Sequence, residues 1–99
     1  MLYRYFLSEM QKLGPVTIHP HKTMAGIANA HKRVAYVTQI GKKFIHVVFP
    51  FKERQDDNFC FQRIQQVPGR NLIYHHFRMQ RREYINGEVR KFMKLAYEP

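Results

Sequence analysis

With 99 residues, the chain is long enough for one hydrophobic core and too short for two, so we expect a single basic domain over residues 1–99. A hydrophobic fraction of 44% with 24% charged residues is typical of a folded chain and excludes a disordered one. The formal net charge of +10 points to anionic partners, because an excess of Lys and Arg attracts nucleic acid, acidic proteins or anionic lipid.

The first predicted element is a helix over residues 2–13, where apolar side chains recur at helical spacing. It should stop at Gly14 and Pro15, because glycine accepts the left-handed backbone at a helix end and proline cannot continue a helix. A helix this short needs tertiary packing, so its apolar stripe should lie on a sheet.

From residue 16 onward, β-branched and aromatic residues alternate with turn formers, which predicts a series of short strands. We place them at residues 16–19, 22–28, 33–40, 44–51, 59–67 and 72–79. The fourth should turn its odd positions to the core, namely Ile45, Val47, Phe49 and Phe51. The fifth segment also fits a single helical turn, so five or six strands are expected.

A second amphipathic helix should begin after Asn86, a residue type that caps helix N-termini, and run to the end of the chain. The predicted fold is therefore α+β: a helix, an antiparallel meander and a helix, with both helices on one face of the sheet.

Four short segments resemble a bacterial family of small domains in the domain-of-unknown-function class. They are His21-Lys22-Thr23-Met24 with Gly26, the strand from Phe44 to Phe49, His75-His76-Phe77-Arg78, and the last helix from Glu88 to Glu98. The resemblance implies no activity. The order of helix, antiparallel sheet and helix also resembles the frataxin-type fold, whose members include iron-binding proteins.

Iron binding of the frataxin kind is not expected here. Hard cations need oxygen ligands, and that kind of site relies on an acidic first helix, whereas Arg4, Glu9 and Lys12 leave this helix slightly basic. His19 and His21 form a weak candidate metal pair, but no third ligand follows at a convincing spacing. We therefore predict no metal and no cofactor.

No catalytic signature is present in the sequence, so we expect a binding domain and not an enzyme. Cys60, flanked by Phe59 and Phe61, is typical of a small buried residue. The enzyme alternative requires a pocket that gathers His21, Lys22, His76 and Glu83.

The leading hypothesis is a platform on the sheet face opposite the helices, where rings stack on nucleobases and cations hold phosphates. It would use Tyr36, His46, Tyr74, His76 and Arg78, with Lys22 and Thr23 as further anion contacts. The partner would be nucleic acid or an acidic protein. The plainer interpretation is a solvated sheet face, which often carries such residues.

A third interpretation is a structural domain that forms homodimers, with Phe44 and Val48 of this face buried against a second copy.

The positive charge is concentrated in two regions: residues 22–43 carry five Lys or Arg and no acid, and residues 70–98 carry seven Lys or Arg against three acids. The single cysteine excludes an internal disulfide and favours a reducing, cytoplasmic location. No segment is apolar enough for membrane insertion.

Overall fold

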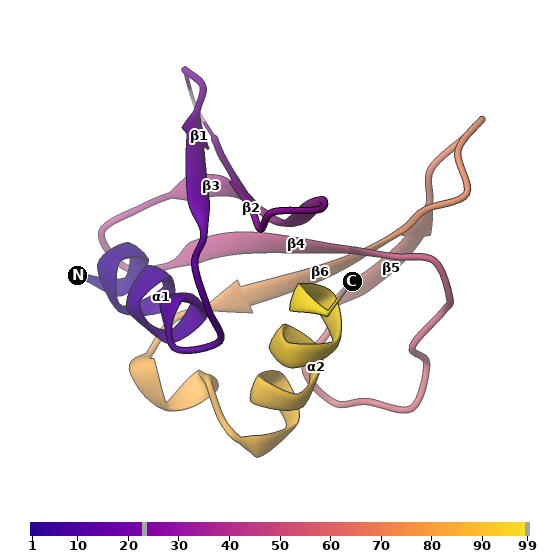
Figure 1. Cartoon of the computed structure of the whole chain (residues 1–99). Helices are drawn as coiled ribbons and strands as arrows, with labels where there is room; N and C mark the ends of the chain where they lie inside the picture. Colours follow the sequence, from indigo (N-terminus) through magenta and orange to yellow (C-terminus); the bar gives the residue numbers. More distant parts are fainter. Residues whose placement is uncertain (23, 99) are drawn as a thin grey trace.

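The computed structural model describes residues 1–22 and 24–98. Two α-helices, a short 3-10 helix (η1) and six strands follow in the order α1 (Leu2–Gln11), β1 (Thr17–Pro20), β2 (Ala25–Ala28), β3 (Arg33–Ile40), β4 (Ile45–Phe51), β5 (Arg63–Gln66), β6 (Ile73–Met79), η1 (Arg82–Tyr84) and α2 (Gly87–Tyr97). The α+β class with a helix at each end is confirmed (Figure 1).

The sheet is antiparallel throughout, and its strand order is β1-β2-β3-β4-β6-β5. It departs from the predicted meander at one place: β4 pairs with β6, and β5 lies outside β6 at the edge. The cause is the long connection after β4, which carries the chain past the position next to β4 before β5 begins. The β5–β6 hairpin then folds back, so that β6 takes that position.

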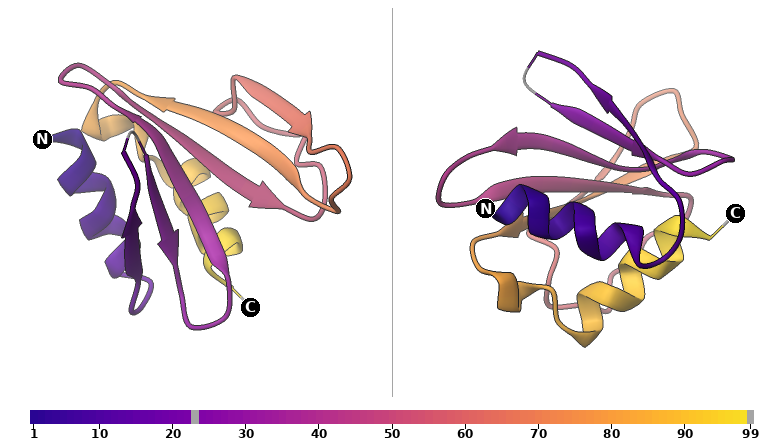
Figure 2. Two further views of the ribbon diagram at one scale, coloured as in Figure 1. Left: turned by 90° about the horizontal axis from the view of Figure 1, so that it is seen from above. Right: turned by 60° about the vertical axis from the view of Figure 1, so that its left-hand side comes forward.

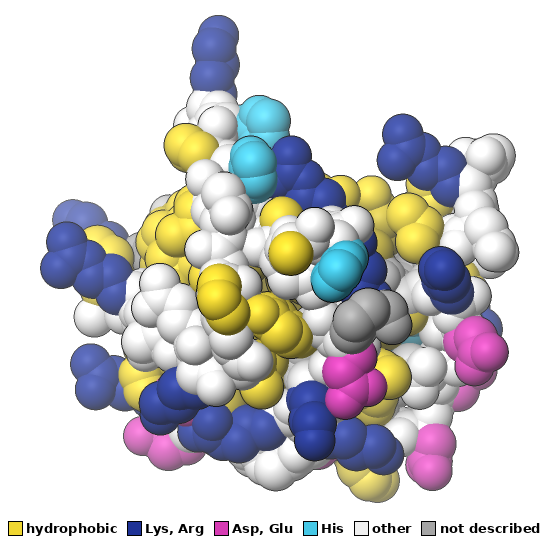
Figure 3. Space-filling model, viewed as in Figure 1, with side chains coloured by type: hydrophobic (Ala, Val, Ile, Leu, Met, Phe, Trp, Pro, Cys, Tyr) yellow, Lys and Arg dark blue, Asp and Glu magenta, His cyan; other side chains and the backbone are white. Residues whose placement is uncertain are grey.

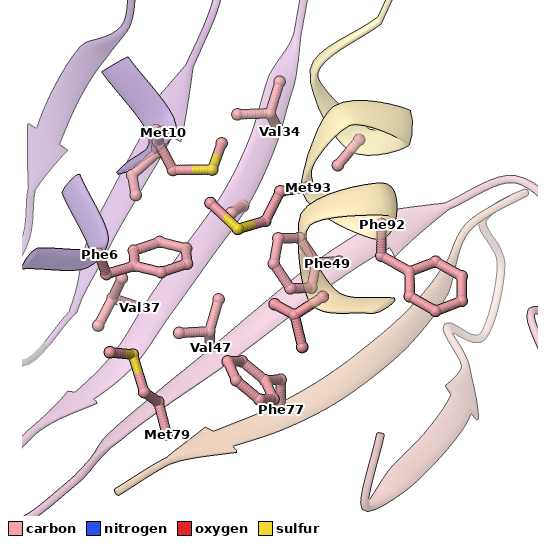
Figure 4. Packing of buried hydrophobic residues seen from close by; sticks show 14 of the residues in the cluster. Phe6, Met10, Val34, Val37, Val47, Phe49, Phe77, Met79, Phe92 and Met93 are labelled. Atoms are coloured by element: carbon pink, nitrogen blue, oxygen red, sulfur yellow. The ribbon is translucent and has the colours of Figure 1, made fainter. Parts of the chain in front are cut away.

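Both helices cover the same face of the sheet, as predicted (Figure 2). Phe6 and Met10 of α1 join Phe92 and Met93 of α2 in one buried cluster on the strands (Figure 4). The four odd positions predicted to face the core are all buried: Ile45, Val47, Phe49 and Phe51. Burial of large apolar side chains, each contributing about 1.5–3 kcal/mol, holds this layer of helices on the sheet.

The ends of the helices follow the predicted signals. Helix α1 finishes at Gln11, and Gly14 takes a φ of +147°, where a Cβ would overlap the ring of Tyr97. The Tyr97 hydroxyl donates to the Pro15 carbonyl at 3.0 Å and ties the two termini together. At the start of α2, the side-chain oxygen of Asn86 accepts from the Val89 N–H at 3.0 Å, which confirms the cap.

Five of the six strands are shorter or shifted relative to the prediction, and of these β4 and β6 merely begin one residue later, at Ile45 and Ile73. Strand β1 is displaced by one residue to 17–20, β2 begins only at Ala25, and β5 covers 63–66 instead of 59–67. The start of the predicted fifth strand forms a turn instead, because Asn58 Oδ1 accepts the Phe61 N–H and the Phe59 N–H donates to Glu88. The backbone hydrogen bonds of this segment therefore go to side chains and not to a neighbouring strand.

Candidate functional site

The sheet face opposite the helices, called the open face below, carries one row of residues that crosses all six strands. Direct cross-strand partners lie on the same face, so the pairing register defines this row. In order from β1 to β5 it contains His19, Gly26, Tyr36, Val48, His76 and Arg63. At about 4.8 Å between strands, the row is about 24 Å long. The rings of Tyr36 and His76 thus lie inside this row, with the imidazole of His19 at one end and the guanidinium of Arg63 at the other.

A second feature of the open face is Arg33, which a bulge in the β2–β3 pairing places there. The register shifts between Ile27 and Ala28, so Ile27 pairs with Ala35 while Ala28 pairs with Arg33. The extra residue, Val34, is buried in the core, and Arg33 takes the face of Tyr36. A strict alternation would have placed Arg33 beside Ala35 on the other face.

At the centre of the open face, the imidazoles of His46 and His76 are in contact. Nε2 of His46 lies 2.9 Å from Nδ1 of His76, a distance at which one nitrogen donates a proton and the other accepts it. Burial, and then the charge of Arg78, lowers the pKa of His46 below its ordinary value. Burial also lowers the pKa of His76, with further contributions from His46, Arg63 and His75. Both imidazoles are therefore neutral at pH 7.

Two tyrosines lie side by side next to this pair. The rings of Tyr36 and Tyr74 have centroids 6.0 Å apart, a distance typical of interacting aromatic pairs. Burial, and then the neighbouring Tyr74, raises the pKa of Tyr36, while the positive charges of Arg33 and Arg70 act in the opposite direction. Two guanidinium groups therefore lie within electrostatic reach of the Tyr36 hydroxyl, as a bound anion would require.

Arg78 and Phe44 flank the row on its other side. The guanidinium carbon of Arg78 lies 4.1 Å from the centre of the Phe44 ring, which fixes the cation in place. Its cross-strand partner is His46, so the predicted residues His46 and Arg78 are neighbours. Arg78 is exposed beside His46, and Arg63 is the direct cross-strand partner of His76, so each imidazole of the pair has a guanidinium neighbour.

The homodimer interpretation relies in part on Val48, which the single chain already buries. Val48 was expected to be free for burial against a second copy, but only 2% of it is exposed in the single chain. It pairs with Tyr36 on one side and with His76 on the other, whose larger side chains cover it. The apolar anchor expected for a homodimer interface is therefore already buried.

The acidic residues of the described chain lie outside the sheet, whereas Lys and Arg lie both on the open face and on the helices. Within the described residues, the strands contain no Asp or Glu, whereas they contribute Arg33, Arg63 and Arg78 to the open face. The acidic residues belong to the helices, to η1 and to the segments that follow β4 and α2. In the view of Figure 3, the Asp and Glu side chains lie in the lower half, where Lys and Arg side chains are present as well. The open face is thus positively charged.

The structure brings together five of the predicted platform residues and leaves two out. Tyr36, His46, Tyr74, His76 and Arg78 share the open face. Lys22 lies in the turn between β1 and β2, with two strands, β3 and β4, between its hairpin and β6, so it belongs to the edge of the sheet. Thr23 lies outside the described residues.

The predicted histidine pair is split by the end of β1. His19 lies in the strand, and the N–H of His21 donates to the Met24 carbonyl in the turn beyond it. Among residues 1–22 and 24–98, no three His, Cys, Asp or Glu side chains gather closely enough to hold a metal ion. Of the adjacent pair on β6, His75 is buried, with its Nε2 accepting from the Gln55 N–H, and His76 lies on the open face.

The remaining catalytic candidates are not assembled. Burial, together with the charge of Glu88 and a hydrogen bond to it, raises the pKa of Cys60 to about 12, so its thiol is not a nucleophile at neutral pH. A surface hollow lined by Arg33, Tyr36 and Glu98, among others, contains none of the four residues required by the enzyme alternative, His21, Lys22, His76 and Glu83.

Sequence reasoning missed Arg33, Arg63 and Arg70 as members of the open face. Arg33 depends on the bulge, and Arg63 on the pairing of β5 with β6, and neither feature has a signal in a single sequence. Arg70 follows Gly69 in the turn between β5 and β6, where only a known hairpin geometry would have indicated its direction.

No protein-family model, no curated protein and no solved structure matches this chain. None of the helices in the described residues has the length and apolar character needed to cross a membrane.

Proposed function

We propose that this domain binds single-stranded nucleic acid on the open face of its sheet. The observation that carries the proposal is the continuous row from His19 to Arg63, which crosses a sheet whose described strands have no acidic residue. The row holds the rings of His19, Tyr36 and His76 and ends at Arg63, and the guanidinium groups of Arg33 and Arg78 lie on the same face beside it. Rings and guanidinium groups are the combination that stacks on bases and holds phosphates.

A single strand fits this face better than a duplex. Base stacking on aromatic side chains needs exposed base faces, which a duplex hides inside its own stack. Tyr36 and Tyr74 lie near the middle of the sheet with Arg33, Arg63 and Arg78 around them, so bases and phosphates of one strand meet complementary groups. A row about 24 Å long suits an oligonucleotide of roughly four to ten nucleotides.

The test is fluorescence anisotropy of a labelled single strand of about ten nucleotides, measured from low to moderate salt. Binding should weaken steeply with salt because each neutralised phosphate releases counterions, with a slope of about −0.7 per contact. Arg78→Ala should reduce that slope by about one contact, and Tyr74→Ala should cost about 1–3 kcal/mol of binding through lost stacking. A duplex of the same sequence should bind more weakly.

The matched control removes the same charge from the other side of the molecule. Arg4 is exposed on α1, and Arg4→Ala leaves the open face unchanged. If Arg4→Ala weakens binding as much as Arg78→Ala, only the net charge matters and the open face is not the site. If no binding occurs at low salt, the nucleic-acid proposal fails.

The same samples distinguish the two other partners. A homodimer would show a mass that rises with concentration in light scattering, and the burial of Val48 leaves it little apolar surface on this face. An acidic protein would compete with the oligonucleotide but would be indifferent to Tyr74→Ala, since it offers no bases to stack. A cytoplasmic location, favoured by the single Cys60, would give the domain access to RNA.

A further inference from the structure

A hollow of about 700 Å³ opens beside the open face, within the range of about 300–1,000 Å³ of small-molecule sites. It lies between the β2–β3 turn, the end of β4 and the last turn of α2, with Leu72 before β6 at its side. Tyr36, a member of the row, and Arg33, which lies on the open face beside it, line the hollow as well. A nucleic-acid strand that lies along the row therefore reaches this hollow directly.

The walls of the hollow combine three kinds of chemistry. Arg33 and Lys52 supply cations, Glu53 and Glu98 supply carboxylates, and Pro50 and Leu72 supply apolar surface. Nη1 of Arg33 is buried and has no hydrogen-bond acceptor among the described residues. A ligand that uses every wall must carry an anion, hydroxyl donors and a flat apolar part in one small unit.

We propose that the hollow holds the 3′-terminal nucleotide of a bound RNA strand, an inference that rests on the proposed function. A nucleotide has the required parts: its phosphate contacts Arg33 and Lys52, its base lies on Pro50 and Leu72, and its ribose hydroxyls donate to the carboxylates. Carboxylates are the usual acceptors for ribose hydroxyls in nucleotide sites. Only the 3′ end of an RNA strand presents a free 2′- and 3′-hydroxyl together.

The two carboxylates also predict what the hollow rejects. A 3′-phosphate adds negative charge where Glu53 and Glu98 already carry it, and like charges brought together out of bulk water repel each other. A DNA end lacks the 2′-hydroxyl and leaves one carboxylate contact unmade. The order of affinity should therefore be RNA with a free 3′ end, then DNA with a free 3′ end, then RNA with a 3′-phosphate.

The experiment compares three oligonucleotides of one sequence, all labelled at the 5′ end: RNA with a 3′-hydroxyl, RNA with a 3′-phosphate, and DNA with a 3′-hydroxyl. The free end should bind at least fivefold more tightly than the 3′-phosphate. Glu98→Gln should bring the two RNA affinities within twofold of each other, because the amide keeps the shape of the side chain and removes its charge. Lys52→Ala should weaken the 3′-hydroxyl RNA about threefold.

Arg78→Ala is the matched variant on the open face: it should weaken both RNAs equally and keep their ratio. Salt-sensitive binding with equal affinity for all ends would overturn the end site while leaving the proposed function standing, and no binding at all would overturn both. Adenosine 5′-monophosphate tests a free nucleotide as the source of the same chemistry. If it displaces the RNA at micromolar concentration, the hollow binds free nucleotides and the inference about a strand end is wrong.

Discussion

The side chain of Arg33 lies over Gly26 in the neighbouring strand, and a Cβ on Gly26 would overlap its Nη1 atom. Gly26 is the position of the row between His19 and Tyr36, so the missing side chain leaves the space in which the guanidinium rests. Close approach of another group is a recognised reason for glycine inside a strand. The bulge and the glycine together place one cation beside Tyr36.

Gly26→Ala should therefore weaken nucleic-acid binding without loss of stability. The new methyl group displaces the far end of a flexible side chain, which costs little, and alanine in a strand is favoured over glycine by about 0.5–1 kcal/mol. We expect the melting temperature to stay the same or rise, and the affinity for a single strand to fall about threefold to tenfold. Thermal denaturation and anisotropy on the same sample measure both.

Gly87→Ala is the control for that substitution. Nothing lies within 4 Å of a Cβ at Gly87, the first residue of α2 on the helix side. The affinity of the Gly87→Ala protein for single-stranded nucleic acid should equal that of the unchanged protein. A Gly26→Ala protein that melts normally and binds normally would show that Arg33 has no part in the site.

The His46–His76 pair should make binding depend on pH. A phosphate placed beside the two neutral imidazoles favours the protonated form and opposes the effects of burial and of Arg63 and Arg78 that lower each pKa. Binding then takes up a proton, so the affinity should rise as the pH falls through about 6.5. Between pH 7.5 and 6.0, at constant ionic strength, we expect an increase of about threefold to tenfold.

The histidine substitutions decide whether this pair is responsible. His46→Gln combined with His76→Gln should flatten the pH dependence, whereas His21→Gln in the β1–β2 turn should preserve it. Folding at each pH must be checked by circular dichroism. His75 is buried in β6, next to His76, and burial lowers its pKa, so folding weakens as the pH falls below 6.5. A pH dependence that survives the double substitution would assign it to other groups.

The sequence predicted the face of each residue wherever strands alternate regularly, and failed where the backbone departs from alternation. Strand β6 is regular, so the placement of Tyr74, His76 and Arg78 on one face is confirmed. In β3 the bulge turns Arg33 to the face of Tyr36, and no residue type marks such a site in a single sequence. The burial of Val48 depends on the size of its neighbours across two strands, which alternation does not describe.

Asn86→Ala should destabilise the domain by about 0.5–2 kcal/mol, because it removes the acceptor of the Val89 N–H at the start of α2. For a chain of this size, each kcal/mol lowers the melting temperature by about 4–8 °C. Asn86→Ser restores a capping oxygen and should recover most of the loss. If the Asn86→Ala and Asn86→Ser proteins have the same melting temperature, the cap contributes nothing to stability. Neither substitution should alter the open face or its affinity for RNA.

Glu9 gives stability a second dependence on pH, on the helix side of the molecule. Its carboxylate is buried between α1 and α2, with Lys12 Nζ and Arg90 Nη2 each 2.5 Å from one oxygen and Lys94 lining the same small hollow. The hydrogen bond from Lys12, and then the contacts of Arg90, lower the pKa of Glu9 below its ordinary value of 4.5 despite burial. The unfolded chain therefore binds a proton at Glu9 more readily than the folded chain.

A group whose pKa is lower in the folded state stabilises the fold above its unfolded value and loses that contribution as the pH falls through the folded value. Glu9→Gln should lower the free energy of unfolding at pH 7 by about 1–3 kcal/mol, with the smaller figure favoured because Lys12 and Arg90 are largely solvated. The difference from the unchanged protein should shrink below pH 4.5, since protonated Glu and Gln carry the same charge. Urea unfolding at pH 7, 5 and 3.5 measures it, with Glu83→Gln in η1 as the exposed control. If the difference in the free energy of unfolding between the two proteins stays constant down to pH 3.5, the Glu9 charge is not held by these two cations.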